Sequence, residues 1–258
     1  MIDTPPERRA RIAAAFGRAE HYEVAATVQR IAANALAGRI AAADLPPEPR
    51  ILELGCGTGF LTRALQEAVG PARWMVSDIA PAMVDRARAA LTIDADYRII
   101  DGEAVDPALG RFDLIASSLA FQWFADLPSA VARLAALLTE GGLLAFSTMA
   151  ADGFPEWTAA LAAEGLRAGT PAYSGQTALA TLAPPGFRAA VELADIPQSQ
   201  PDARTFLRRL KAIGAGTPAE GYRPLPPAAL RAAMARFDAG PRIVTWRIAY
   251  CFFRPISG

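Results

Sequence analysis

Three glycines at alternate positions are the strongest chemical signal in the sequence, within residues 51–59 (ILELGCGTG). The run predicts a short apolar strand, a glycine turn and a helix that opens near Thr58. Glycine permits tight bends and leaves the backbone amides bare, so a ligand can approach them more closely than a Cβ would allow. The helix N-terminus adds unpaired N–H groups and a partial positive charge that suit a small anion. We therefore expect Gly55, Gly57 and Gly59 to line a ligand site.

Two neighbouring side chains narrow the choice of ligand. Dinucleotide-binding loops have a glycine at the position where this chain has Phe60. Just before the loop, the carboxylate of Glu53 would repel pyrophosphate and attract a cation. S-adenosylmethionine fits both ends, because it has a carboxylate, an ammonium group and a positively charged sulfur but no phosphate. The run resembles motif I of the class I S-adenosylmethionine-dependent methyltransferases.

Acidic residues follow the next two expected strands. Asp78 ends the second strand, where a carboxylate can accept hydrogen bonds from both ribose hydroxyls. The alternative for Asp78 is an N-cap for the helix begun by Pro81. Asp101 ends the third strand, where it can accept a hydrogen bond from the adenine amino group while Gly102 leaves room for the ring; a solvated turn is the alternative. The strand ends add three more residues to the predicted cofactor site, namely Ile79, Glu103 and Ser117.

The segment after the fourth expected strand, 112–117, contains Gln122 and Trp123. In a sheet ordered by the usual crossover rules this segment lies beside the glycine loop, so we expect it to form the floor of a methyl-transfer site. Packing is the alternative role for Trp123. Gln122 is the more informative of the two, because it is a polar residue in an apolar setting.

Composition limits the class of protein. The 258 residues are 52% hydrophobic, which is enough for one large α/β domain with an appendage. Acidic and basic residues balance at 26 each, so no global field favours nucleic acid or a membrane surface. Cys56 and Cys251 indicate neither a disulfide framework nor a metal site. The N-terminus lacks the apolar core of a signal peptide and no segment is apolar enough to cross a bilayer, so we expect a cytoplasmic protein without a metal.

Alternating strands and helices predict an α/β fold with a doubly wound parallel sheet and helices on both of its faces. Ligands of such sheets bind beyond the carboxyl ends of the strands. We expect Gly141 and Gly142 to end a helix and start a strand. The expected elements are helix 8–40, strand 51–54, helix 58–69, strand 73–77, helix 81–91, strand 97–100, strand 112–117, helix 127–138, strand 143–148, helix 155–166, strand 187–193, helix 203–213, helix 227–238 and strand 243–253.

Motifs outside the core resemble one branch of these enzymes, the malonyl-acyl-carrier-protein O-methyltransferases of biotin synthesis. The most discriminating segment is Leu-Lys-x-Ile-Gly-Ala at 210–215. The resemblance implies a Rossmann-like, seven-stranded methyltransferase sheet that is mostly parallel, with an antiparallel last strand and a helical insertion near the C-terminus. It also implies N-terminal lid helices in 1–45, a cofactor-binding core in 46–150 and substrate-facing or carrier-facing helices in 151–258, all within one structural domain. The other matching segments are 15–23, 29–30, 119–123 and 145–148.

The same resemblance implies the reaction. S-adenosylmethionine would methylate the free carboxylate of a malonyl thioester, carried by acyl carrier protein or coenzyme A, and leave S-adenosylhomocysteine. A carboxylate is ionised near pH 7, so the step needs no strong base. Tight pairing with arginine would stabilise the charge of the reactant, so we expect neutral donors, namely Tyr22 on the lid and Gln122. His21, the single histidine, is expected to be a solvated surface residue.

Helix 203–213 has a basic face formed by Arg204, Arg208 and Lys211. A basic face on a protein without net charge suits binding of an acidic carrier protein, because electrostatic attraction would set the rate and orientation with which the two proteins meet. The solvated face of an ordinary amphipathic helix is the alternative.

Two rival functions remain open. One is methylation of a free small acid, as in trans-aconitate methyltransferases. The other is a regulatory or assembly subunit that binds S-adenosylmethionine without catalysis.

Overall fold

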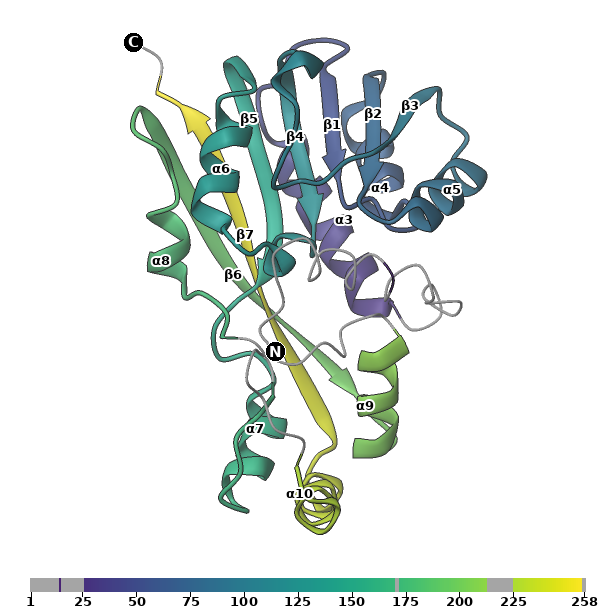
Figure 1. Ribbon diagram of the computed structural model, residues 1–258, viewed down its shortest axis with the longest axis vertical. Coiled ribbons are helices and arrows are strands. Elements are labelled where there is room, and N and C mark those ends of the chain that lie inside the picture. The colour runs from purple at the N-terminus through teal and green to yellow at the C-terminus, as the bar shows by residue number, and fades with distance from the viewer. Residues whose placement is uncertain (1–13, 15–25, 170–171, 213–224, 257–258) are drawn as a thin grey trace. The chain divides into compact units, whose positions relative to one another are not determined.

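The computed structural model describes residues 14, 26–169, 172–212 and 225–256. Among these residues, seven strands form one sheet in the order β3-β2-β1-β4-β5-β7-β6, with β7 antiparallel to its neighbours (Figure 1). This arrangement confirms the expected fold class. The strands are β1 (Arg50–Leu54), β2 (Arg73–Asp78), β3 (Ala95–Ile99), β4 (Phe112–Ser118), β5 (Leu138–Met149), β6 (Phe187–Ser199) and β7 (Ile243–Pro255).

The order of the strands reverses at β1, which pairs in parallel with β2 on one side and with β4 on the other. In this register Ile51 lies beside both Trp74 and Leu114. All but the first residue of β1 are buried, as expected for a parallel strand that is covered on both faces. The carboxyl ends of the three strands therefore meet at one edge, where doubly wound sheets bind their ligands.

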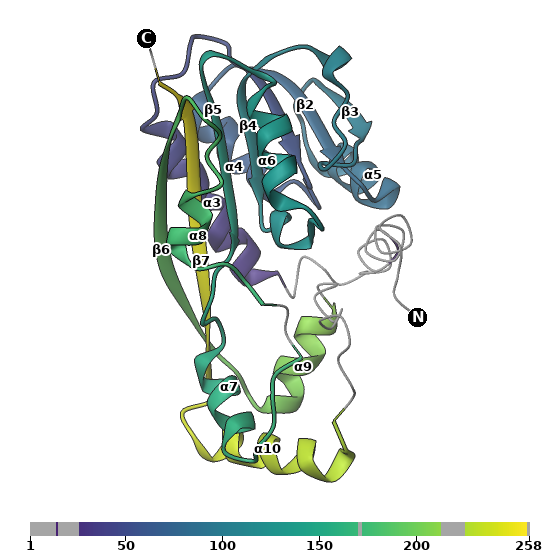
Figure 2. The same ribbon diagram turned by 60° about the vertical axis from the view of Figure 1, so that its left-hand side comes forward.

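Helices cover both faces of this sheet. In Figure 2, α6 and α8 lie in front of the strands, and α3 and α4 lie behind them. Helix α4 begins at Phe60 rather than Thr58, because Gly59 has a φ of 87° and is therefore left-handed. The helices are α3 (Thr27–Ala41), α4 (Phe60–Val69), α5 (Pro81–Ala90), α6 (Leu127–Ala135) and α8 (Gln176–Ala180).

One sequence-based expectation is wrong, because Gly141 and Gly142 do not end a helix. Helix α6 ends at Ala135 and β5 begins at Leu138, so both glycines lie inside the strand. The pairing between β4 and β5 shifts register in this stretch, and extra residues of β5 are accommodated there. Gly141 has a φ of 79°, which glycine adopts without strain. The sequence analysis also missed α8 and the short 3-10 turns η1 (Pro107–Leu109) and η2 (Phe121–Trp123).

The chain divides into two compact units, each of which combines segments that are distant in sequence. The first, here called the core unit, is Gln29–Thr148, Gly175–Leu193 and Ala249–Gly258. The second, here called the aromatic unit, is Met1–Val28, Met149–Ser174 and Ala194–Ile248. The glycine loop and the strands β1 to β4 belong to the core unit.

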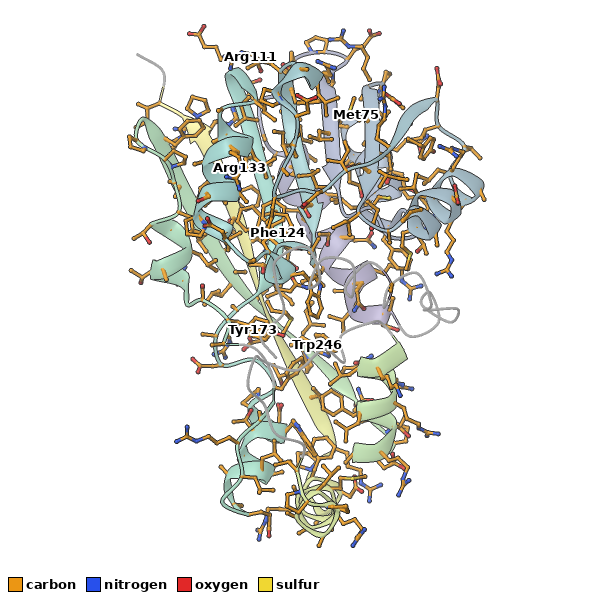
Figure 3. All side chains as sticks on the ribbon, viewed as in Figure 1. Met75, Arg111, Phe124, Arg133, Tyr173 and Trp246 are labelled. Carbon is orange, nitrogen blue, oxygen red and sulfur yellow. The ribbon has the colours of Figure 1, made fainter. Side chains whose placement is uncertain are left out.

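Buried rings form the centre of the aromatic unit. Trp157 lies edge-on to both Phe206 and Phe237, with the ring centroids 6.0 Å apart in each pair. Phe154 packs edge-on to Trp246, with the ring centroids 4.7 Å apart. Trp246 is labelled in Figure 3. Aromatic rings bury large areas, so this cluster stabilises the packing of the helices that contribute to it. The helices of this unit are α7 (Pro155–Ala162), α9 (Ala203–Ala212) and α10 (Pro227–Ala239).

Candidate functional site

Positive φ angles shape the loop after β1, with 69° at Gly55, 54° at Gly57 and 87° at Gly59. Residues with a side chain rarely adopt this region of backbone conformation. At Gly55 there is also no space, because a Cβ would lie 2.6 Å from the Cβ of Ala120. Ala120 belongs to the segment after β4, so the structure brings that segment directly against the glycine loop.

The strands on either side of β1 hold the loop in place. The amide of Cys56 donates to the carbonyl of Ser77 at 2.9 Å. The Ser77 hydroxyl in turn donates to the carbonyl of Glu53 at 2.7 Å, and the Ser117 hydroxyl donates to the carbonyl of Leu54 at 2.8 Å. Both serines are fully buried. Ser117, predicted from the sequence as a cofactor contact, therefore positions the last residue of β1.

Asp78 joins the glycine loop to the turn after β2. One carboxylate oxygen accepts a hydrogen bond from the amide of Gly57 at 3.0 Å, and the other accepts one from Ala80 at 2.9 Å. Burial raises the pKa of Asp78, and these two amides partly oppose that shift. The helix N-cap is Ala80, and it has no side-chain cap, so Asp78 is not the N-cap considered as its alternative role. Ile79 lies between these residues and is half-buried.

Glu53 is a buried carboxyl group beneath the loop. It is 1% exposed, and its Oε2 accepts a hydrogen bond from the Thr62 hydroxyl at 2.6 Å. Burial raises the pKa of Glu53 to about 8, while the hydrogen bond from Thr62 acts in the opposite direction. The group therefore holds a proton at neutral pH in this structure. A cation beside it would lower the pKa and favour the carboxylate.

A buried hydroxyl group without a partner among the described residues lies in the glycine loop, where a ligand could bind it. Thr58 is 5% exposed, and its Oγ1 has no hydrogen-bond partner among the residues that the structure describes. An unsatisfied buried hydroxyl costs about 1–3 kcal/mol. The hydroxyl lies within the glycine loop, next to Gly57 and Gly59. The loop thus offers a spare neutral hydrogen-bonding group and, in Glu53, an acid, which fits a ligand with both carboxylate and ammonium groups.

The turn after β4 has a strained backbone fixed by side chains. Leu119 has a φ of 53°, and its amide donates to the Ser147 carbonyl at 3.0 Å. The side-chain amide of Gln122 donates to the Leu119 carbonyl at 2.6 Å, and its oxygen accepts a long bond from the Thr148 hydroxyl at 3.4 Å. Gln122 therefore stabilises the turn, and its oxygen keeps capacity for a second donor. Trp123 is half-buried in the same turn.

The end of β3 is tied to the loop that precedes α6. The amide of Glu103 donates to the Asp101 carboxylate at 2.9 Å. Glu103 itself is buried, and its Oε1 accepts hydrogen bonds from the amides of Ala125 and Asp126 at 2.9 and 2.8 Å. This carboxylate holds the loop, which is a role that the sequence analysis did not anticipate. The cofactor role of Asp101 and Glu103 stays a prediction.

Phe124, which is labelled in Figure 3, was also missed. It lies against Gly102. A Cβ at Gly102 would lie 2.6 Å from the Phe124 ring. The same ring stacks on Phe121, with centroids 4.5 Å apart. The tip of the Phe124 ring thus occupies the space that a side chain at Gly102 would fill, so this glycine makes room for Phe124. The adenine site beside Gly102 stays a prediction. An isolated aromatic residue in a loop has no sequence signal that would have predicted this position.

The remaining predicted residues lie elsewhere in the chain. Tyr22 and His21 are outside the described residues. Arg204, Arg208 and Lys211 are exposed on α9, whereas the helix buries Phe206. The basic face predicted from helical periodicity is therefore present on the surface of the aromatic unit.

No group of three or more His, Cys, Asp or Glu side chains among the described residues is arranged to hold a metal ion. The described helices are also all too short or too polar to cross a membrane.

The fold and the glycine loop define a Rossmann-like methyltransferase. Residues 51–142 match a family model described as a methyltransferase domain. The YcgJ protein of Bacillus subtilis superposes with a TM-score of 0.60 at 15% identity, over 87% of this chain and 99% of that chain. The plantazolicin methyltransferase BpumL, solved in complex with a triazolic desmethylPZN analog and SAH, superposes with a TM-score of 0.58 at 13% identity over 98% of both chains. These two likenesses support the fold.

Curated sequences identify the branch. A malonyl-[acyl-carrier protein] O-methyltransferase of Magnetococcus marinus is 36% identical, over 95% of this chain and 93% of its own length. The biotin biosynthesis bifunctional protein BioCD of Bordetella avium is 48% identical over 93% of this chain, which spans only 51% of that protein. The chain belongs to the malonyl-[acyl-carrier protein] O-methyltransferase family. The resemblance stated from the sequence is thereby confirmed.

Proposed function

We propose that this protein transfers a methyl group from S-adenosylmethionine to the free carboxylate of a malonyl thioester on acyl carrier protein. The products are the methyl ester and S-adenosylhomocysteine, and the step belongs to the cytoplasmic synthesis of a biotin precursor. The observation that carries the proposal is family membership across nearly the whole length of a curated relative. The glycine loop supports it, because its geometry suits a ligand with an amino-acid end and no phosphate.

Each part of the glycine loop has a role in binding the methyl donor. When bound, S-adenosylmethionine supplies a methyl group on a positively charged sulfur, which makes that carbon open to attack. The Thr58 hydroxyl binds the carboxylate of the amino-acid end, and Glu53 in its ionised form neutralises the ammonium group. Asp78 retains lone pairs beyond those used by Gly57 and Ala80, so it accepts the ribose hydroxyls. Phe124 and Asp101 border the adenine ring.

Methylation of the acceptor carboxylate requires no proton transfer by the protein. The malonyl carboxylate is ionised near pH 7, and it attacks the methyl carbon directly as the carbon–sulfur bond breaks. Catalysis then comes from alignment and from removal of water around the nucleophile. Gln122 lies in a turn fixed against Leu119, so a neutral side chain is held rigidly beside the glycine loop. We assign orientation of the acceptor to Gln122, Trp123 and Tyr22.

The exposed basic face of α9 is the proposed contact for the carrier protein. Acyl carrier proteins would be recognised by their acidic surface, and Arg204, Arg208 and Lys211 offer a matching row of cations. Contacts of this exposed kind change the rate of association more than the chemistry of the bound complex.

The test is methyl transfer from radiolabelled S-adenosylmethionine to malonyl carrier protein, malonyl-coenzyme A, free malonate and trans-aconitate. We expect the carrier-bound substrate to react fastest. The double reversal Arg208→Glu/Lys211→Glu should raise KM for the carrier substrate about tenfold or more and leave kcat nearly unchanged. The matched control is Arg73→Glu/Arg133→Glu, which makes the same change in net charge at exposed positions of the core unit.

Each rival function has its own outcome. Preferred methylation of trans-aconitate or malonate, indifferent to the α9 reversals, would replace the carrier substrate with a free acid. Tight cofactor binding without methyl transfer to any of the four acceptors would instead indicate a non-catalytic subunit.

A further inference from the structure

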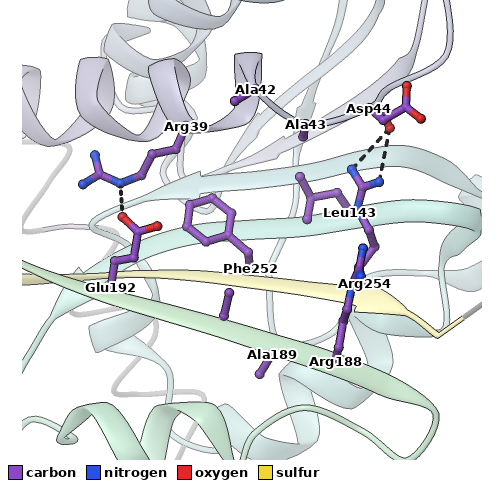
Figure 4. Close-up of a pocket in the computed structure, with 11 residues that line it drawn as sticks. Arg39, Ala42, Ala43, Asp44, Leu143, Arg188, Ala189, Glu192, Phe252 and Arg254 are labelled. Atoms are coloured by element: carbon purple, nitrogen blue, oxygen red, sulfur yellow. Dashed lines mark hydrogen bonds and ion pairs between the residues drawn. The ribbon is translucent and has the colours of Figure 1, made fainter.

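A cavity lies in the core unit, at the edge of the sheet formed by β6 and β7. Its volume is about 650 Å³, which is in the range of small-molecule sites. The C-terminal end of α3 borders it on one side and the two strands border it on the other (Figure 4). None of its lining residues belongs to the candidate site described above. The lining includes Arg39, Leu143, Arg188, Glu192, Phe252 and Arg254.

Two of its arginines face each other across neighbouring strands. The amide of Ile256 donates to the carbonyl of Gly186 at 2.8 Å, which sets the register between antiparallel β7 and β6. Two residues further along each strand, Arg188 stands opposite Arg254, and both line the cavity. Like charges directly opposite each other in a sheet repel and destabilise the pair. The fold therefore holds a concentrated positive charge at this end of the cavity.

The two guanidinium groups have little compensation. Among the described residues, Arg254 donates only to the neutral backbone carbonyl of Asp44, through two long bonds of 3.3 Å. The carboxylate of Asp44 also lines the cavity, but in the described part of the chain it forms no ion pair with Arg254 or Arg188. Arg188 makes no hydrogen bond or ion pair with any described residue. The third arginine differs, because Arg39 pairs with Glu192 at 2.8 Å at the other end of the cavity. Its charge is already neutralised, so the uncompensated charge belongs to Arg188 and Arg254.

The middle of the cavity is apolar. Phe252 and Leu143 lie between the arginine pair and the Arg39–Glu192 ion pair (Figure 4). A ligand that fills the space thus has an anionic group at one end and an apolar body beside these side chains. Inorganic ions alone would leave the apolar part without a partner.

We propose that this cavity binds a small organic phosphomonoester, with its phosphate between Arg188 and Arg254. A phosphomonoester carries close to two negative charges at pH 7 and three terminal oxygens, enough to match two guanidinium groups. A carboxylate has one charge and two oxygens, so it neutralises only one of the two guanidinium charges. The inference goes beyond methyl transfer, because it concerns a separate site and does not depend on the proposed reaction.

The test is isothermal titration calorimetry with phenyl phosphate as the probe, on the full chain. Arg188→Gln removes one guanidinium that has no described partner, so the variant should fold normally. We expect saturable binding to the unsubstituted protein and binding weakened about tenfold or more in Arg188→Gln. Arg188→Lys should give an intermediate affinity, because lysine keeps the charge without the planar fork. Arg73→Gln is the matched control, since Arg73 is exposed and lies outside the cavity, and it should bind like the unsubstituted protein.

Benzoate and inorganic phosphate separate the two parts of the proposed ligand. We expect benzoate to bind weakly because of its single charge, and inorganic phosphate to bind weakly because it lacks an apolar body. Equal affinity of phenyl phosphate for the unsubstituted protein and Arg188→Gln would overturn the site. Benzoate binding as tightly as phenyl phosphate would overturn the phosphate class. A melting temperature of ligand-free Arg188→Gln at or above that of the unsubstituted protein verifies the fold and agrees with relief of repulsion.

Discussion

The glycine loop and the β6–β7 edge differ in whether their charged side chains are buried and hydrogen-bonded. At the loop, Glu53 and Asp78 are buried and their oxygens accept hydrogen bonds from within the core unit. At the edge, Arg188 is exposed and lacks a described partner, and no residue of β6 is buried. The loop therefore depends on a fixed geometry in a desolvated setting, whereas the edge keeps charge accessible. Substitutions at the two places should differ sharply in cost.

The largest effect is expected for Gly55→Ala. The new methyl group would require a left-handed alanine and would lie 2.6 Å from the Cβ of Ala120. Backbone strain and overpacking together should reduce the free energy of unfolding by about 4 kcal/mol, measured by urea denaturation. Adding Ala120→Gly removes the clash but not the strain, so it should restore part of the loss. A stable Gly55→Ala protein with unchanged binding of S-adenosylhomocysteine would contradict the geometry of the loop.

Glu53→Gln tests the buried carboxyl through pH. The pKa of Glu53 is about 8 in the folded chain and 4.5 in the unfolded chain. Between pH 4.5 and pH 8 the carboxyl group is therefore protonated in the folded state and ionised in the unfolded state. Stability linked to this group is present below pH 4.5 and is lost as the pH rises through 8. A neutral amide avoids that loss, so we expect Glu53→Gln to be more stable than the parent by about 3 kcal/mol at pH 9 and nearly equal at pH 4.5.

Thermal melts across this pH range provide the measurement. The conservative variant Thr62→Val should lower the stability of the parent at both pH values, because it removes the hydrogen bond to Glu53. If Glu53→Gln were less stable than the parent at pH 9, the pKa of the Glu53 carboxyl would not be raised in the folded state.

Asp78→Ala should weaken binding of S-adenosylhomocysteine by about 2 kcal/mol, because it removes the proposed ribose acceptor. Calorimetry measures this change directly. Asp85→Ala is the control, since Asp85 is a mostly exposed acid on α5 whose ion pair with Arg88 lies at the surface. Parent-like affinity in Asp78→Ala would place the ribose elsewhere.

The smallest effect is expected at the edge, for Glu192→Ala. The Arg39–Glu192 ion pair is close in distance but solvent-exposed, so its loss should change stability by less than about 0.5 kcal/mol. Urea denaturation at low and high salt measures the difference. A loss comparable to that of Gly55→Ala would remove the contrast between the buried loop and the exposed edge.

Local patterns accounted for most of the core unit. The glycine spacing, the acids at the strand ends and the alternation of strands with helices each follow from rules that act over a few residues. Gly141 and Gly142 show the limit of such rules. Two glycines before an apolar run are compatible with the start of a strand, as predicted, and also with the interior of an irregular strand, as observed. The correct choice depended on pairing between β4 and β5, which no local pattern contains.

Roles of individual site residues divide in the same way. The sequence by itself predicted cofactor roles for Glu53 and Asp78 and a basic face on α9, because chemical type and helical or strand periodicity are local properties. Only the tertiary structure decided that Ser117 and Glu103 hold backbone groups and that Phe124 lies against Gly102. It alone also placed Arg188 opposite Arg254, residues that are 66 positions apart in the chain. Contacts between distant segments arise from strand register and packing, so their energies cannot be inferred from either segment alone.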